Sequence, residues 1–217
     1  MNRLETICSG ERMELFAEKA IFWPRKKTLL VADPHFGKAS AFRHAGIPVP
    51  EDVTAEDLKR LDALLAATRA RRMIFLGDFF HAKTGKSIAT VESLNQWIAN
   101  HRDLEFHLIR GNHDIHSGAV PEDWRFHITD NTLCDPPFVF SHAPFFSGEG
   151  YVVAGHIHPA VRCGMRLPCF HFGAHCAVLP AFGGFTGTHV IKPEPTDRVF
   201  VLNEGEIAEL PMLTFRS

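Results

Sequence analysis

The sequence has no excess charge of either sign, no long apolar run and no cysteine framework. Lys and Arg number 23 against 25 Asp and Glu, which gives a formal net charge of −2. Proteins that attract nucleic acid through their overall charge are strongly basic, so such a role would need a local basic surface here. Such a surface could include Arg69, Arg71 and Arg72 or Lys83 and Lys86, although solvated surface charge explains these residues more simply.

The sequence also lacks the segments that direct a chain to a membrane. No stretch of about 18 uncharged apolar residues occurs, and the first residues do not contain the continuous apolar segment of a secretion signal. The five cysteines are odd in number and include no C-x-x-C pair, which favours reduced thiols. We therefore expect a cytoplasmic protein with no membrane partner, because disulfides are rare in the reducing cytosol.

The length of 217 residues predicts one domain over residues 1–217, because single hydrophobic cores stop growing near roughly 250 residues. In the first half, short apolar runs alternate with segments that carry apolar residues at helical spacing. Strands are expected at 28–32, 72–76 and 105–109, and helices at 55–70 and 88–100. This alternation is typical of βαβ units with parallel strands.

The second half changes character after about Trp124, where short strand-like runs are separated by Gly, Pro and Asn. Two packed sheets with helices outside them would accommodate both halves. The predicted fold class is therefore α/β, with two packed mixed β-sheets flanked by helices.

Each predicted strand that leads into a motif ends in residues that can bind metal. Asp33 and His35 follow the run at 28–32, and Asp78 follows the run at 72–76. The carboxyl ends of strands in α/β sheets converge on one crevice, so residues that are far apart in sequence can meet there. The other residues of this kind are Asn112, His142, His156 and His158.

These seven side chains are carboxylates, imidazoles and one amide, a donor set that suits Mn²⁺, Fe or Zn²⁺. A single catalytic zinc takes about three protein ligands, so seven donors indicate two ions that share one carboxylate. Taken singly, each residue is explained as well by a turn or a core histidine, but turns do not explain the whole set. Gly77, Gly111 and Gly155 mark places where the backbone must turn sharply or approach the ions closely.

The ordered motifs D-x-H at 33–35, G-D-x-x-H at 77–81, G-N-H-D at 111–114, a lone histidine at 142 and G-H-x-H at 155–158 resemble the calcineurin-like binuclear metallophosphoesterase superfamily. The resemblance covers residues 28–159 and implies the calcineurin-like fold with two divalent ions. One departure is Pro34 inside D-x-H, which predicts extended backbone geometry at Asp33. The resemblance assigns one ion to Asp33, His35, Asp78 and His158, and the other to Asp78, Asn112, His142 and His156.

Three further stretches, at 42–50, 155–162 and 179–187, resemble a narrower bacterial branch of endonucleases that are encoded beside an ATP-dependent DNA ligase. This likeness implies an Mn²⁺-dependent endonuclease that prefers single-stranded DNA and acts in DNA repair, with Zn²⁺ or Fe as alternative ions. DNA and a repair protein such as that ligase are the expected partners. The same ligands also allow a nucleotide or small-molecule phosphatase, whereas the complete donor set disfavours a non-enzymatic scaffold.

The predicted chemistry is the attack of a metal-activated water on phosphorus. His113 resembles the family's histidine that faces the leaving group, where it would protonate the departing oxygen. Asp114 either holds that imidazole in position or is a plain turn residue. His81 is expected beside Asp78, within reach of the substrate.

Several other residues have weaker patterns. Arg43 and His44 lie in a stretch too rich in Pro and Gly for a helix, where they either overhang the site and bind phosphate or belong to a surface loop. Phe145 and Phe146 either pack in the core or stack on bases. The segment 85–87 resembles a phosphate-binding loop but lacks its first glycine. A zinc cluster is considered for Cys169, His171, His175 and Cys176. It is disfavoured because these residues alternate as in a strand followed by a turn.

Overall fold

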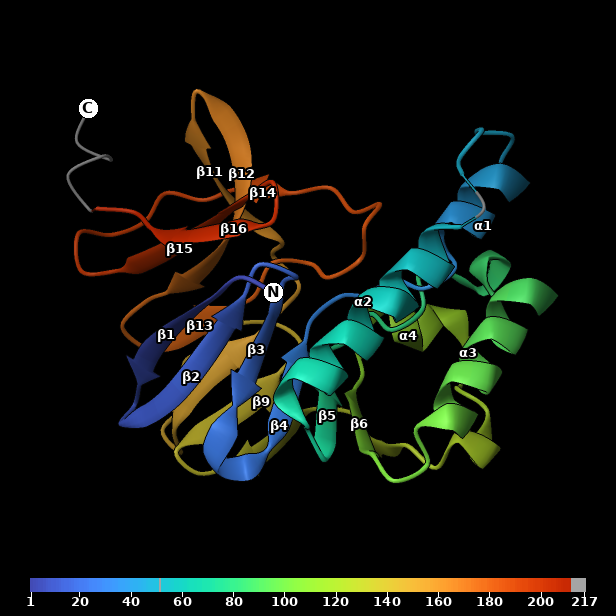
Figure 1. Cartoon of the computed structure of the whole chain (residues 1–217), viewed down its shortest axis with the longest axis horizontal. Helices are drawn as coiled ribbons and strands as arrows, with labels where there is room; N and C mark the ends of the chain where they lie inside the picture. Colours follow the sequence, from blue (N-terminus) through green and yellow to red (C-terminus); the bar gives the residue numbers. More distant parts are fainter. Residues whose placement is uncertain (51, 212–217) are drawn as a thin grey trace.

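The structure is a computed structural model that describes residues 1–50 and 52–211, and two β-sheets form its centre (Figure 1). The first sheet has seven strands in sequence order: β1 (Arg3–Cys8), β2 (Glu11–Phe16), β3 (Ala20–Trp23), β4 (Thr28–Val31), β5 (Arg72–Phe75), β6 (Glu105–Ile109) and β7 (His127–Thr129).

The second sheet has the order β14-β11-β12-β13-β10-β9-β8, with β15 paired to β12 and β16 paired to β15. Its strands are β8 (Thr132–Asp135), β9 (Phe138–Ser141), β10 (Tyr151–Ala154), β11 (Pro159–Cys163), β12 (Met165–Phe172), β13 (Cys176–Val178), β14 (His189–Val190), β15 (Arg198–Asn203) and β16 (Glu206–Glu209).

The α-helices of the described residues are α1 (Lys38–His44), α2 (Val53–Thr68), α3 (Ile88–Asn100) and α4 (Asn112–Ser117). Short 3₁₀ turns occupy Pro24–Lys26, Lys83–Gly85 and Glu122–Trp124. Within the described residues, no helix has the length and apolarity needed to span a bilayer.

Parallel pairing joins β4 through β7, as expected for βαβ units whose crossovers carry α2 and α3. The strands predicted at 28–32, 72–76 and 105–109 are confirmed, each to within one residue. The helix at 88–100 is confirmed at both ends, and the helix expected at 55–70 occupies Val53–Thr68. The antiparallel strands β1, β2 and β3, which widen the first sheet, were not predicted.

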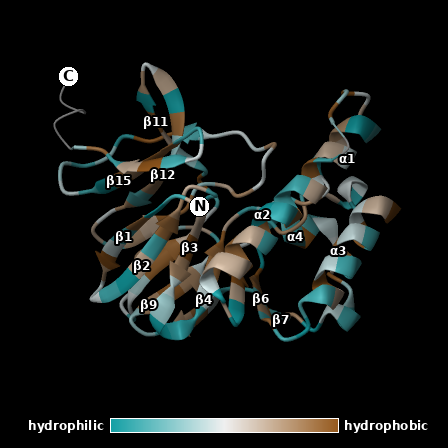
Figure 2. Ribbon diagram, in the orientation of Figure 1, coloured by the Kyte–Doolittle hydropathy of each residue, from teal (hydrophilic) through white to brown (hydrophobic). Residues whose placement is uncertain are grey.

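Buried hydrophobic residues form two core clusters, one on each face of the first sheet. Figure 2 shows the hydrophobic residues of the strands in brown. On the outer face, α2 and α3 bury leucines such as Leu61 and Leu94 against Phe75 of β5. Between the sheets, aromatic rings of the second sheet meet aliphatic residues of the first, and burying each such side chain stabilises the fold by roughly 1.5–3 kcal/mol. This inter-sheet core includes Leu15, Trp23, Leu30, Ile74, Phe138, Phe140, Phe170 and Phe200.

The α-helices of the described residues lie on the side of the first sheet (Figure 1). The outer face of the second sheet instead carries small clusters made of strand residues, such as Val139 with Val152 and Val161 with Cys169. The predicted class of two mixed sheets with helices is confirmed, with the helices arranged as one layer against the first sheet.

The segment around Arg43 is helical, which corrects the expectation that Pro and Gly exclude a helix there. Helix α1 ends at His44, before the first of these residues, Gly46, which adopts a left-handed φ of 80°. Lys38, Ala39, Ala41 and Arg43 are four of the seven residues of α1 and have good helix propensity. The Gly and Pro residues therefore lie after the end of the helix and do not prevent it from forming.

We predict that Phe170→Ala, which removes a fully buried ring from the inter-sheet core, lowers the free energy of unfolding by about 3–5 kcal/mol. Urea denaturation followed by tryptophan fluorescence measures this change. Phe146→Ala is the matched control, because its ring is exposed and should change stability by less than about 0.5 kcal/mol. Equal losses in the two variants would contradict the described packing.

Candidate metal centre

The polar motifs lie just beyond strand ends that belong to both sheets. Asp33 and Asp78 follow β4 and β5, and Asn112 begins α4 after β6. These three strands are parallel neighbours, so their carboxyl ends share one edge of the first sheet. His142 follows β9 and His156 follows β10, which are parallel neighbours in the second sheet.

One group of possible ligands contains Asp33, His35 and His158, whose nearest donor atoms all lie within 4.8 Å of one another. The Nε2 atom of His158 is 3.7 Å from Oδ2 of Asp33 and 3.4 Å from Nε2 of His35. The Nδ1–H of His158 donates to the carbonyl oxygen of Gly187 at 3.1 Å, so its Nε2 lone pair faces the group.

A second group contains Asp78, His142 and His156, again within 4.8 Å. The Nδ1–H of His142 donates to the carbonyl oxygen of Leu76 at 3.0 Å, so its Nε2 carries a lone pair. That nitrogen lies 3.0 Å from Oδ1 of Asn112 and 3.0 Å from Nδ1 of His156. Acceptor atoms that lie this close repel one another unless a cation lies between them. Such convergence of acceptor atoms is typical of a metal site.

Asp78 connects the two groups. Its Oδ2 atom is 3.8 Å from Nε2 of His35 in the first group. Its Oδ1 atom is 3.6 Å from Nε2 of His142 in the second group and accepts a hydrogen bond from the backbone amide of His113 at 2.9 Å. A carboxylate in this position can bridge two ions.

Burial and charge in the described site fit divalent cations. Asp33 is fully buried, and its Oδ1 atom has no hydrogen-bond partner among the described residues. Burial lowers the pKa of His35 to about 2, with nearby His158 and Lys38 acting in the same direction, so the imidazole stays neutral as a metal ligand must. Burial raises the pKa of Asp78, and bound cations would reverse that effect.

Five of the seven predicted ligands have a left-handed backbone conformation, which costs an L-residue roughly 1–2 kcal/mol. Asp33 has a φ of 48°, so the expectation that Pro34 holds it in extended geometry is wrong. Strained backbone of this kind clusters at functional sites, where the surrounding fold maintains it. The other four are His35, Asp78, His156 and His158, with φ between 48° and 70°.

Gly77, Gly111 and Gly155 lie where no side chain would fit. A Cβ atom on Gly77 or Gly111 would overlap the side chain of His142 or of Asp78, and one on Gly155 would overlap that of Asp33. The backbone at these glycines therefore approaches the side chains of the candidate ligands closely, whereas its approach to the ions stays a prediction.

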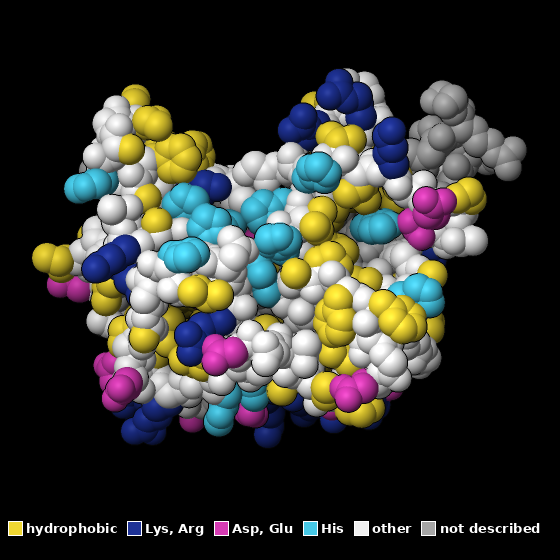
Figure 3. Space-filling view, turned by 180° about the vertical axis from the view of Figure 1, so that it is seen from behind, with side chains coloured by type: hydrophobic (Ala, Val, Ile, Leu, Met, Phe, Trp, Pro, Cys, Tyr) yellow, Lys and Arg dark blue, Asp and Glu magenta, His cyan; other side chains and the backbone are white. Residues whose placement is uncertain are grey.

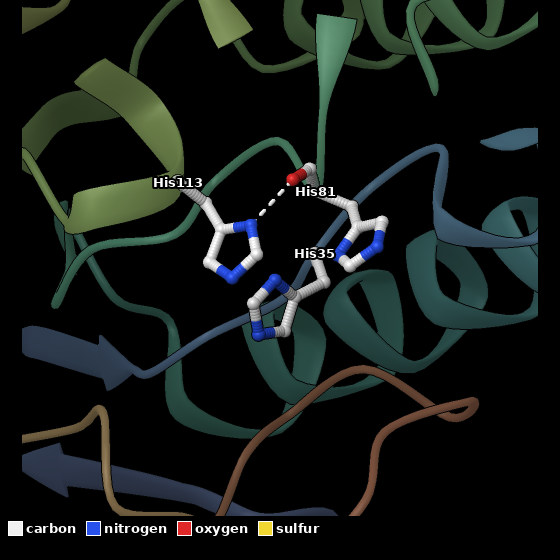
Figure 4. A group of neighbouring side chains, drawn as sticks. All are labelled: His35, His81 and His113. Atoms are coloured by element: carbon white, nitrogen blue, oxygen red, sulfur yellow. Dashed lines mark hydrogen bonds between the residues drawn. The ribbon is translucent and has the colours of Figure 1, made fainter. Parts of the chain in front are cut away.

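His113 lies beside the two groups, and its orientation is set by a backbone carbonyl (Figure 4). Its Nδ1–H donates to the carbonyl oxygen of His81 at 2.6 Å, and its Nε2 is 4.0 Å from Oδ2 of Asp78. The rings of His81 and His113 stack with centroids 5.0 Å apart. His81 therefore lies next to the first ligand group, with its ring edge-on to that of His35, and its contact with substrate stays a prediction.

Asp114 does not orient the imidazole, which corrects the first of its two predicted roles. Its Oδ1 and Oδ2 atoms accept hydrogen bonds from the backbone amides of Phe80 and Gly111 at 3.2 and 2.9 Å. A carboxylate at the third position of a helix commonly binds the amide that precedes the helix. Asp114 thus fixes the start of α4, where Asn112 lies, and ties it to the loop that carries Asp78.

Two other residues differ from the sequence-based picture. The guanidinium of Arg43 donates to the carbonyl oxygens of Val49 and Pro50 at 3.2 and 2.8 Å, so it ties α1 to its following loop. Lys38 was not predicted, yet its positive charge adds to the effect of burial, which lowers the pKa of both His35 and His81. The sequence signal was available, because Lys38 is the third residue after His35 and opens α1.

The two disfavoured patterns have structural roles. Lys86 donates to the carbonyl oxygens of Gly118 and Ala119, so it braces a loop. Cys169 is buried in the outer cluster of the second sheet, and His171 pairs with Asp197 at 2.7 Å.

The strand ends of two packed sheets thus bring together two carboxylate–imidazole groups that share one aspartate. This arrangement is that of a metal-dependent phosphoesterase. Residues 26–175 match the calcineurin-like phosphoesterase family, and the chain belongs to that family. The predicted superfamily is thereby confirmed. Membership and the paired groups support metal-dependent hydrolysis of phosphoesters.

Among solved structures, nuclease MPE of Pseudomonas putida is 36% identical, covers 96% of this chain and 100% of its own, and has a TM-score of 0.84. Protein AQ665 of Aquifex aeolicus, of unknown function, is 17% identical over 60% of this chain and 78% of its own, with a TM-score of 0.38. Yfce, a phosphoesterase from E. coli, is 15% identical over 87% and 94%, with a TM-score of 0.38. No curated protein matches this sequence.

We predict that Gly111→Ala abolishes high-affinity metal binding, because its Cβ atom would displace Asp78 and His142. Displacements of about 1 Å can lower a rate by roughly 10²-fold. Mn²⁺ content after dialysis and hydrolysis of bis(nitrophenyl) phosphate measure both effects. Gly148→Ala is the control, because nothing lies within 4 Å of its added carbon. Normal Mn²⁺ content in Gly111→Ala would refute the proposed ligand set.

Proposed function

We propose that this protein is a two-metal DNA endonuclease that uses Mn²⁺ and prefers single strands. The observation that carries the proposal is the position of the Asp78 carboxylate. Its Oδ2 atom lies near His35 of the first group, and its Oδ1 atom lies near His142 of the second. The similarity to a nuclease over 96% of the chain supports nucleic acid as the substrate. The resemblance of residues 42–50 and 179–187 to repair-cluster endonucleases supports DNA repair as the setting.

The ligands of one ion would be Asp33, His35, Asp78 and His158, and those of the other Asp78, Asn112, His142 and His156. Bound ions would supply an activated water and stabilise the phosphate oxygens. Asn112 is a neutral ligand, so the two carboxylates leave the loaded site positively charged, which attracts a phosphodiester. Lys38 adds a further positive charge on the side of His35 and His81.

His113 would donate a proton to the leaving oxygen. Because the His81 carbonyl accepts from Nδ1, the group that faces the site is Nε2, and it carries a proton when the ring is an imidazolium. That proton passes to the oxygen that departs from phosphorus, and the neutral ring remains held through Nδ1.

A flexible substrate suits this site. Duplex DNA is stiff, with a persistence length of about 50 nm, whereas a single strand can bend to bring one phosphate to the candidate ligand groups. A net charge of −2 provides no general attraction for a long duplex.

We predict that His113→Ala lowers DNA cleavage by roughly 10²- to 10⁴-fold while hydrolysis of bis(nitrophenyl) phosphate is nearly unchanged. Nitrophenolate departs readily without a proton, whereas a sugar oxygen does not. His116→Ala, an exposed histidine of the same helix, serves as the control. Equal losses on both substrates would show that His113 acts structurally.

Closed circular single-stranded DNA tests the proposed function directly, because it has no ends. With Mn²⁺ we expect conversion of the circle to linear products, faster than any nicking of duplex DNA. EDTA and Asp78→Ala should each abolish the reaction. An intact circle together with rapid dephosphorylation of mononucleotides would replace the endonuclease by a phosphatase.

A further inference from the structure

The face that carries the histidines is hollowed between two projections (Figure 3). Histidine side chains lie along the floor of the hollow. Helix α1 and its following loop form one projection, where hydrophobic side chains gather, and the β11–β12 hairpin forms the other, where Lys and Arg side chains gather (Figures 1 and 3). The basic side of this hollow has no part in the metal centre described above.

Two arginines face each other on that hairpin. Arg162 of β11 and Arg166 of β12 are directly paired across the antiparallel strands, and both are exposed. Like charges in directly opposite positions destabilise a sheet. A bound anion would relieve this repulsion. Anion binding therefore explains why two arginines lie opposite each other, whereas a general need for solubility does not.

The described residues contain no carboxylate that forms an ion pair with either guanidinium; Arg166 instead donates to the carbonyl oxygen of Thr188 at 3.2 Å. Other arginines of the chain differ in this respect. Arg72 pairs with Asp135, and Arg198 pairs with Glu209. The hairpin arginines therefore keep their charge available for a partner outside the chain.

The hairpin is joined rigidly to the metal centre. Strand β11 starts at Pro159, directly after His158, and pairs in parallel with β14. The amide of His189 donates to the carbonyl oxygen of His158 at 2.9 Å. Arg162 lies four residues beyond His158, or roughly 13 Å along an extended strand. It is too distant to contact the reacting phosphate and well placed for phosphates farther along the same strand.

We propose that Arg162 and Arg166 form a clamp for backbone phosphates of a single-stranded nucleic acid, next to the phosphate that is cut. The inference rests on the proposed nuclease function and adds the surface that holds the substrate. The opposite projection suits the bases, since Phe185 is exposed there and its ring meets that of Phe42 at 5.6 Å. The clamp provides the local basic surface that a net charge of −2 makes necessary.

The test compares Arg162→Gln/Arg166→Gln with Arg69→Gln/Arg102→Gln, which removes the same charge. Arg69 and Arg102 are exposed after the ends of α2 and α3, at the edge of the first sheet where β5 and β6 begin, opposite the metal centre. Oligo(dT) binding by fluorescence anisotropy, KM for single-stranded DNA and hydrolysis of bis(nitrophenyl) phosphate are measured with Mn²⁺ over a range of salt concentrations.

The hairpin variant should bind oligo(dT) about tenfold more weakly at low salt, with a correspondingly higher KM. Its plot of log affinity against log salt should be shallower by about 1.4, or 0.7 for each lost phosphate contact. Hydrolysis of the small ester should match the wild type, because that substrate does not reach the hairpin. Arg162→Lys/Arg166→Lys retains the charges and should largely restore binding.

Two results would overturn the clamp while leaving the nuclease function in place. The first is equal DNA binding and salt dependence in the two glutamine variants. The second is an equal loss of activity on DNA and on the small ester in the hairpin variant. The latter would show that the hairpin supports the metal centre instead of the substrate. A wild-type protein that hydrolyses the small ester but neither binds nor cuts DNA would refute both the proposed function and the clamp.

Discussion

The carboxylate of Asp78 is nearly fully buried between the imidazoles of His35 and His142. A buried anion of this kind is stable only when donors or cations balance it. The His113 amide supplies one donor, but His35 is held neutral by its lowered pKa, and Asp33 adds a second buried carboxylate. Divalent ions would therefore balance the charge of this arrangement, and the surrounding loops would hold their ligands in place.

The two sheets make this arrangement possible. The first sheet places both aspartates at neighbouring strand ends, and the second supplies His142, His156 and His158 from β9, β10 and the loop after β10. Neither sheet alone contains a complete ligand group. The aromatic core between them holds the two sets of strand ends in register, and its stability offsets the cost of the left-handed backbone at the ligands.

Hydrophobic spacing was sufficient to predict the parallel strands and helix α3. The strand-end motifs singled out the seven candidate ligands, which the structure brings close together and whose binding of metal stays a prediction. Strands β1 and β2 were missed because exposed charged residues, such as Glu5 in β1 and Arg12 in β2, interrupt their apolar pattern. Strand β3 has no such interruption, since its four residues are all apolar and buried, and it was overlooked. The left-handed conformation of Asp33 is imposed by the fold around it. The preference of a residue before proline for extended backbone therefore gave a wrong prediction. The sequence left two roles open for Asp114, because a carboxylate next to His113 can orient that imidazole or bind backbone amides. In the structure it binds the amides of Phe80 and Gly111.

Anomalous diffraction from crystals grown with Mn²⁺ tests the central claim most directly, because it locates each ion without reference to activity. The account predicts two peaks about 3.5–4 Å apart, with Asp78 bound to both, His35 and His158 on one ion, and His142 and His156 on the other. A single ion in this region, or two ions with Asp78 bound to only one of them, would contradict it.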